Sequence, residues 1–151
     1  DAAAQAADDY DSPALRPVSH ALPAEARWIA VELGDDIVWP LPSVGLSNDL
    51  GQVVDRESLA VITQRLKEKR YPAIAIAVSS ARPPDRGVQR SIASLVSGSE
   101  QCWLVLLQKY RDEAVTEKRL ASWYRLADAC GIPADHVISL SLSQGEHSYE
   151  A

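Results

Sequence analysis

The apolar run at residues 73–80, Ala-Ile-Ala-Ile-Ala-Val-Ser-Ser, predicts a buried strand, and residues 82–87 predict a stiff loop and a helix start. A strand without polar alternation is covered on both faces, which is typical of a parallel sheet flanked by helices. Loops after such strands are where α/β proteins place ligands. This run therefore predicts a fold class and the place to look for a site.

The rest of the chain alternates strand and helix patterns. Short apolar or alternating runs predict further strands at residues 27–33, 50–54, 102–107 and 138–142. Apolar residues at helical spacing predict helices from Asp55 to about Arg70, from Asp85 to Gly98 and from Leu120 to Cys130. Strands that alternate with helices form parallel sheets through right-handed crossovers. We therefore expect an α/β fold, Rossmann-like or flavodoxin-like, with three layers: a mostly parallel sheet of four or five strands and helices on both faces.

Three parts of the chain differ in composition. Residues 1–26 are rich in Ala and Pro and lack an apolar stripe, which predicts a flexible linker or arm. Residues 27–143 hold every predicted strand and helix and fit one α/β domain, since domains cluster at about 100–150 residues. Residues 144–151 are predicted to be a polar tail. Residues 34–50 are predicted to be a long irregular loop around Trp39, and such loops are uncommon unless they have a function.

Charge and composition argue against several classes of function. The net charge of −6 disfavours nucleic acid as a partner, because phosphate binding needs clustered Lys and Arg. No apolar stretch is long enough to span a bilayer, and the chain begins at Asp1, so we expect a fragment whose membrane attachment lies outside it. Cys102 and Cys130 match no metal or redox spacing and are expected to be small buried hydrophobes in a reducing compartment. The three His residues are scattered, so we expect surface positions, no metal site and no cofactor.

The candidate site follows from the geometry of parallel sheets, whose strand carboxyl ends meet at one edge. The residues expected there for ligand or partner binding are Glu32, Asp35, Asp36, Trp39, Ser79, Arg82, Asp85, Arg86 and Gly87. Gln108 and Lys109 follow the strand at 102–107 and are expected to face the same way. The set matches no complete catalytic constellation, so we assign no catalytic residue.

Asp55 and Asp85 have a structural explanation that we prefer. An Asp before a helix accepts backbone N–H groups and is favoured by the helix dipole, which is typical of an N-cap. Arg82 and Arg86 near a helix start would favour an anion. However, this loop has a single glycine where phosphate-binding loops have several, and Asp85 would repel a phosphate.

A sparse likeness to two-component receiver domains is also present. The acids, hydroxyl and lysine of such a site would be Asp35, Asp36, Asp55, Ser79 and Lys109. The stretch before Asp55 is too short for the helix and strand that a receiver has there, and Lys109 is not followed by Pro. We therefore interpret these side chains as solvated loop residues.

Three short motifs resemble a known family. They are Arg27-Trp28-Ile29-Ala30-Val31-Glu32-Leu33-Gly34-Asp35-Asp36 followed by Trp39-Pro40, then Asp55-Arg56-Glu57-Ser58, then Pro84-Asp85-Arg86-Gly87. Over about residues 27–142 the chain resembles the soluble C-terminal region of a family of proteobacterial inner-membrane proteins of unknown function. Members carry transmembrane helices before this region, and their genes tend to lie beside one for a predicted GTPase. The resemblance implies a cytoplasmic, membrane-tethered domain with a GTPase as candidate partner, and it carries over no catalytic residue.

Two classes of function remain open. We favour a noncatalytic binding or regulatory module at the cytoplasmic face of a bacterial inner membrane, acting through protein contacts. The alternative is a nucleotide- or anion-binding enzyme domain that uses Glu32, Asp35, Arg82, Asp85 and Arg86, with Mg²⁺ as a candidate ligand of the acids. Stabilisation by nucleotides or divalent metals would separate the two.

Overall fold

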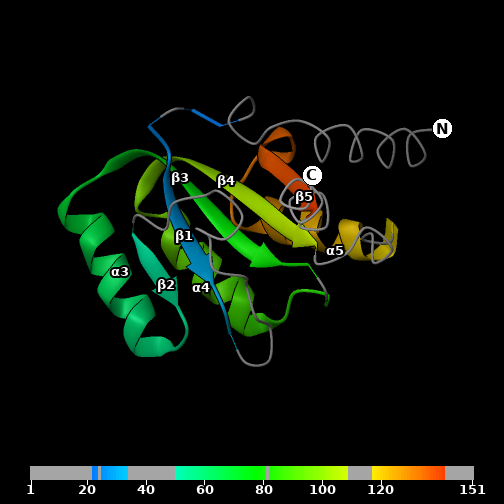
Figure 1. Cartoon of the computed structure of the whole chain (residues 1–151), viewed down its shortest axis with the longest axis horizontal. Helices are drawn as coiled ribbons and strands as arrows, with labels where there is room; N and C mark the ends of the chain where they lie inside the picture. The colour runs from blue at the N-terminus through cyan, green and yellow to red at the C-terminus, as the bar shows by residue number, and fades with distance from the viewer. Residues whose placement is uncertain (1–21, 24, 34–49, 81, 109–116, 142–151) are drawn as a thin grey trace, which may run out of the picture.

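The computed structural model describes residues 22–23, 25–33, 50–80, 82–108 and 117–141. Its centre is a five-stranded sheet whose neighbouring strands all pair in parallel, so that their arrowheads point to one edge in Figure 1. The strands are β1 (Arg27–Val31), β2 (Gly51–Val53), β3 (Tyr71–Ser79), β4 (Ser99–Gln108) and β5 (Val137–Ser141). The helices are α3 (Arg56–Glu68), α4 (Arg86–Val96), α5 (Glu117–Ala129) and the short 3₁₀ helix η3 (Ala134–His136). The predicted α/β class with a parallel sheet is confirmed.

The strand order is β2-β1-β3-β4-β5. This is the order of flavodoxin-like folds, one of the two variants expected from the sequence. The chain goes from β1 outward to β2 and then crosses back over β1 to reach β3. As a result β1 has a neighbour on each side, with Ile29 opposite Gly51 of β2 and Ile76 of β3.

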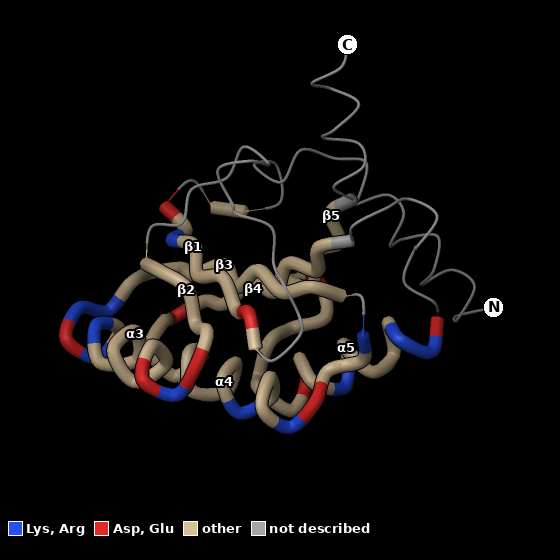
Figure 2. The backbone as a smooth tube through the Cα atoms, turned by 60° about the horizontal axis from the view of Figure 1, so that its bottom comes forward, with Lys and Arg blue, Asp and Glu red and all other residues tan. Residues whose placement is uncertain are grey.

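All three α-helices pack on the same face of the sheet, as Figure 2 shows. The sequence predicts helices on both faces, and within the described ranges one face carries them all. The reason is the direction of the crossovers. The connections β2 to β3, β3 to β4 and β4 to β5 all advance the same way across the sheet, so right-handed crossovers place their helices on one side. Only β1 to β2 runs the other way, and residues 34–49 of that connection are not described.

The two faces of the sheet carry side chains of different size. On β3, Ile74 and Ile76 belong to the cluster that includes the helices, whereas Ala75 and Ala77 belong to the cluster on the other face. All four are fully buried. Burial of an Ile side chain contributes about 1.5–3 kcal/mol, so the helix-covered face supplies the larger share of the core.

The described end of the predicted arm contacts the domain. Leu22 packs in the same cluster as Trp28, and the N–H of Ala26 donates to the carbonyl oxygen of Pro23 at 3.1 Å. The rest of the arm, residues 1–21, and the tail lie outside the described residues, so their assignment stays a prediction.

Candidate functional site

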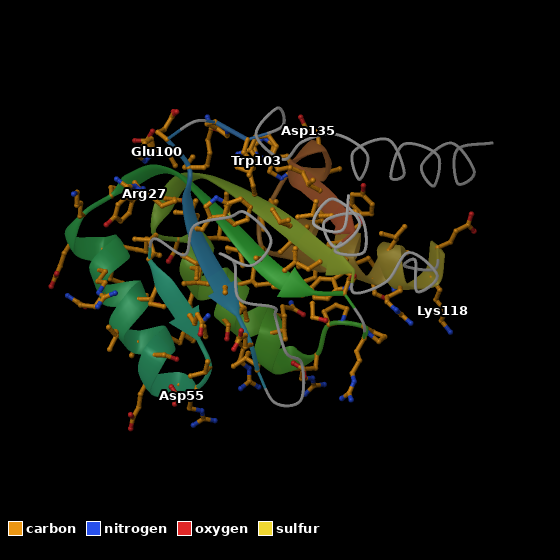
Figure 3. All side chains as sticks on the ribbon, viewed as in Figure 1. Arg27, Asp55, Glu100, Trp103, Lys118 and Asp135 are labelled. Carbon is orange, nitrogen blue, oxygen red and sulfur yellow. The ribbon has the colours of Figure 1, made fainter. Side chains whose placement is uncertain are left out.

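The strand order creates a topological switch point between the carboxyl ends of β1 and β3, the place where flavodoxin-like folds bind their ligands. Glu32 follows β1 there, and Ser80 follows β3. Helices α3 and α4 begin at the same edge. Figure 3 shows Asp55 at this edge, at the start of α3, and Trp103 at the opposite edge.

Hydrogen bonds hold the end of β3 in place. Ser80 is 1% exposed, and both its N–H and its hydroxyl donate to the carbonyl oxygen of Leu107, at 2.9 and 3.0 Å. Arg119 of α5 donates from Nη1 to the carbonyl oxygen of Ser80 at 3.2 Å. Ser79, half-buried, ends β3 in register with Leu107. These contacts give Ser80 a structural role and connect β3, β4 and α5.

Asp85 caps α4, as predicted. Its Oδ1 accepts the N–H of Val88 at 2.8 Å. Arg82, Arg86 and Gly87 are exposed beside it. A Cβ atom on Gly87 would lie 3.3 Å from Oδ1 of Asp85, so the glycine leaves room next to the cap.

Asp55 caps α3 through a capping box with Ser58. Its Oδ1 accepts the Ser58 N–H at 2.8 Å, while the Ser58 Oγ accepts the Asp55 N–H at 3.0 Å. The hydrogen bond from the Ser58 backbone, and then that from its hydroxyl, lower the pKa of Asp55. The carboxylate is therefore charged at neutral pH and occupied with the helix end.

Glu32 differs from the two capping acids. It is half-buried after β1, and its backbone N–H donates to the carbonyl oxygen of Val53 at 2.8 Å. Burial raises the pKa of its carboxyl group, because less water surrounds the charged form.

The structure brings part of the predicted site together. Glu32, Ser79 and the segment from Arg82 to Gly87 lie at the carboxyl edge, where β1 and β3 are neighbours. Gln108 is the last residue of β4. Four predicted residues lie outside the described part of the chain: Asp35, Asp36, Trp39 and Lys109.

A hollow of about 590 Å³ opens beside this edge, between the start of α3 and one side of α4. The described residues around it are Leu33, Asp55, Arg56 and Leu59 on one side, and Gly87, Arg90, Ser91 and Ser94 of α4 on the other. At their other ends the two helices meet, because Gly98 lies against Leu66. The helices thus touch near their C-termini and leave space between their N-termini.

The polar groups of the hollow have few partners. Arg56 and Arg90 are exposed, and neither forms an ion pair or side-chain hydrogen bond with the described residues. Ser91 is 4% exposed, and its hydroxyl has no hydrogen bond within the same ranges. Leu33 and Leu59 are half-buried and add an apolar wall.

Sequence reasoning missed Arg90, Ser91 and Ser94. Their spacing is the available signal, since Ser91 and Ser94 lie three residues apart and Arg90 follows Arg86 by four, which keeps each pair on one helix face. The spacing does not show that the start of α3 lies opposite. That juxtaposition depends on the strand order.

The opposite edge of the sheet holds an aromatic pair. Trp103 of β4 stacks on His136 of η3 with ring centroids 3.9 Å apart and an interplanar angle of 7°. Nδ1 of His136 lies 3.1 Å from the carbonyl oxygen of Cys102. His136 is half-buried, because stacking and a backbone contact hold its ring, so it is less exposed than a solvated surface residue.

Two features are absent from the described ranges. Within them, no group of three His, Cys, Asp or Glu side chains is placed to hold a metal ion. No helix in those ranges has the length and apolar character needed to cross a membrane.

Comparison with protein families matches residues 1–132 to a family described as "Protein of unknown function (DUF2868)". The chain belongs to this family. The match supports the resemblance to a family of unknown function, and it extends through the segment expected to be an arm. No curated protein and no solved structure matches the chain. The description of this family names no reaction.

Proposed function

We propose that this DUF2868 domain is a noncatalytic binding or regulatory module that acts through protein contacts at the carboxyl edge of its sheet. In the full protein it is held at the cytoplasmic face of a bacterial inner membrane by segments outside this chain. A GTPase is the candidate partner. The membrane setting and the partner rest on the resemblance of the sequence motifs.

One contrast at the edge supports this proposal most. The carboxylates of Asp55 and Asp85 are engaged by helix N-termini, whereas Arg86 and Arg90 are exposed and have no ion pair among the described residues. Arg is among the residues that dominate interface energetics, and its guanidinium binds carboxylates through two parallel hydrogen bonds. An acidic surface on a partner would complement this edge.

The enzyme alternative has less support. Asp85 is occupied as a cap, and burial makes Glu32 hold its proton more readily than an ordinary Glu, which weakens it as a cation ligand. Thermal unfolding with Mg²⁺ and nucleoside triphosphates tests this alternative. A ligand at a hundredfold its dissociation constant stabilises a protein by about 2.7 kcal/mol. A stabilisation of that size that disappears in Glu32→Gln would favour the enzyme.

The protein-binding proposal is tested by measuring the affinity of this domain for the purified candidate GTPase. We expect Arg86→Ala and Trp39→Ala each to weaken binding by about 1 kcal/mol or more with an unchanged melting temperature. Arg125→Ala is the matched control, because Arg125 is an exposed Arg on α5, away from the candidate edge. Equal affinity of the wild type, Arg86→Ala and Trp39→Ala would overturn the proposed surface.

A further inference from the structure

The hollow between α3 and α4 has the features of a small-molecule site. We propose that it binds an organic anion, consisting of an apolar or planar body with one phosphate or carboxylate group. This inference goes beyond the protein-binding proposal and does not depend on any partner protein.

The charge of the ligand follows from the groups around the hollow. Arg56 and Arg90 approach it from opposite helices, and neither guanidinium is paired within the described ranges. The start of α3 also lies at the hollow, where the dipole of that helix favours negative charge, whereas α4 lines the hollow along its side from Gly87 to Ser94. Asp85, which the sequence suggested would repel an anion, is not among the residues that line it.

Ser91 supplies the hollow with a hydroxyl group that can donate to a ligand. The oxygen of Ser91 is not among the fully buried side-chain atoms that lack a partner in the described ranges, so the hydroxyl keeps access to water at the hollow. Ser91 lines the hollow at 4% exposure, and its hydroxyl finds no partner in the described part of the chain. An oxygen of a bound anion would accept its O–H.

Size and lining indicate an organic body rather than a bare ion. Pockets for small molecules have volumes of about 300–1,000 Å³, and the hollow's 590 Å³ lies within that range. Leu33, Leu59 and Gly87 provide apolar surface beside the charged groups. The body of the ligand would lie on this surface while its head group reaches the arginines.

Asp55 is the one carboxylate among the described lining residues, and it opposes an anion. Asn is as good an N-cap as Asp, so Asp55→Asn removes the charge and retains the bond to the Ser58 N–H. This variant should bind an anion about threefold more tightly, the size expected for unit charges several ångströms apart in water. Arg90→Ala should bind about tenfold more weakly, the loss of one charge-assisted contact.

The test uses the dye 1-anilinonaphthalene-8-sulfonate, an anion with an apolar body whose fluorescence rises when it binds. We expect the wild type to bind it, Asp55→Asn to bind it more tightly, and Arg90→Ala and Ser91→Ala to bind it more weakly. Ser91→Ala should keep or raise the melting temperature, because Ala is a better helix former than Ser, and this separates loss of the site from loss of the fold. Val61→Ala is the matched control, since Val61 is an exposed apolar residue of α3 that does not line the hollow.

Competition then identifies the head group. Displacement of the dye by adenosine 5′-monophosphate supports a phosphate, and displacement by phenylacetate supports a carboxylate. Neutral adenosine should displace neither the dye nor the anions. The proposal would be overturned if the wild type did not bind the dye, if Arg90→Ala and Asp55→Asn bound it equally, or if Asp55→Asn bound it more weakly than the wild type. It would also be overturned if neither anion displaced the dye.

Discussion

Gly98 lies directly against Leu66. A Cβ atom on Gly98 would overlap the Cβ of Leu66 and lie 3.0 Å from its Cδ1. Leu66 is fully buried in the last turn of α3, and Gly98 follows the end of α4. The backbone of Gly98 has no positive φ, so the position needs space rather than special conformational freedom. This contact sets the distance between the two helices at the end opposite the hollow.

Gly98→Ala should therefore separate α3 from α4. We expect the free energy of unfolding, measured by urea denaturation, to fall by about 1–3 kcal/mol, as for other overpacked cores. Gly87→Ala is the matched control, because its Cβ would meet only the Asp85 carboxylate at 3.3 Å, and Ala is the better helix former by up to about 1 kcal/mol. An unchanged stability of Gly98→Ala would mean that the contact does not fix the helix spacing.

The cap of α4 gives a second prediction. Asp85→Ala removes the acceptor for the Val88 N–H and should lower the free energy of unfolding by about 1 kcal/mol, whereas Asp85→Asn and Asp85→Ser should lower it less. Thermal and urea unfolding of the three variants provide the measurement. If Asp85→Asn retains full stability but loses partner binding, capping is an insufficient account and the carboxylate has a role in recognition.

Much of the fold was predictable because its signals are local. Caps at Asp55 and Asp85 and the apolar strand at 73–79 depend on neighbours in sequence, and the structure places helices and a strand at those positions. The strand order and the one-sided packing of the helices were not predicted, since both depend on contacts between distant segments. The Ala–Ile alternation at residues 73–78 indicates that the two faces of the sheet differ, because it gives one face large side chains and the other small ones.

The candidate site was predictable only in part. Residues directly after strands, such as Glu32 and Arg82, were found because parallel strands end at one edge. Arg90 and Ser91 were missed, because they face the hollow only when α3 lies beside α4. Ser80 follows β3 at this edge, but its hydroxyl donates to the Leu107 carbonyl oxygen, a contact between distant strands that the sequence does not show.

Asp55 should stabilise the fold in a pH-dependent way. Its pKa is lowered in the folded state by the Ser58 backbone N–H and hydroxyl, so its contribution is present above the pKa of the unfolded state and is lost as the pH falls through the folded value. The wild type should therefore lose stability in acid more steeply than Asp55→Asn. Urea unfolding from about pH 6 to about pH 3 measures the difference. Parallel curves for the two proteins would contradict this assignment.

Glu32 should have the opposite dependence. Burial raises its pKa in the folded state, so its contribution is fully present below the unfolded pKa and is lost as the pH rises through the folded value. Glu32→Gln cannot ionise and should gain stability relative to the wild type as the pH increases above the ordinary range of Glu. A constant difference between the two proteins across that range would show that the carboxyl group is solvated.

The two cysteines should differ in reactivity. Burial, with a smaller effect of the nearby Cys130 thiol, raises the pKa of Cys102 to about 12, and the side chain is 5% exposed, so the reactive thiolate is scarce and inaccessible. Cys130 is half-buried, and burial also raises its pKa.

The reactivity can be measured with a disulfide reagent such as Ellman's at about pH 8, where an ordinary thiol of pKa about 8.5 is partly ionised. We expect slow reaction of Cys130 and none of Cys102 until urea unfolds the protein. The variant Cys130→Ser should be inert when folded and release one equivalent on unfolding. Rapid reaction of folded Cys130→Ser would show that Cys102 is accessible and that the β4 core opens under native conditions.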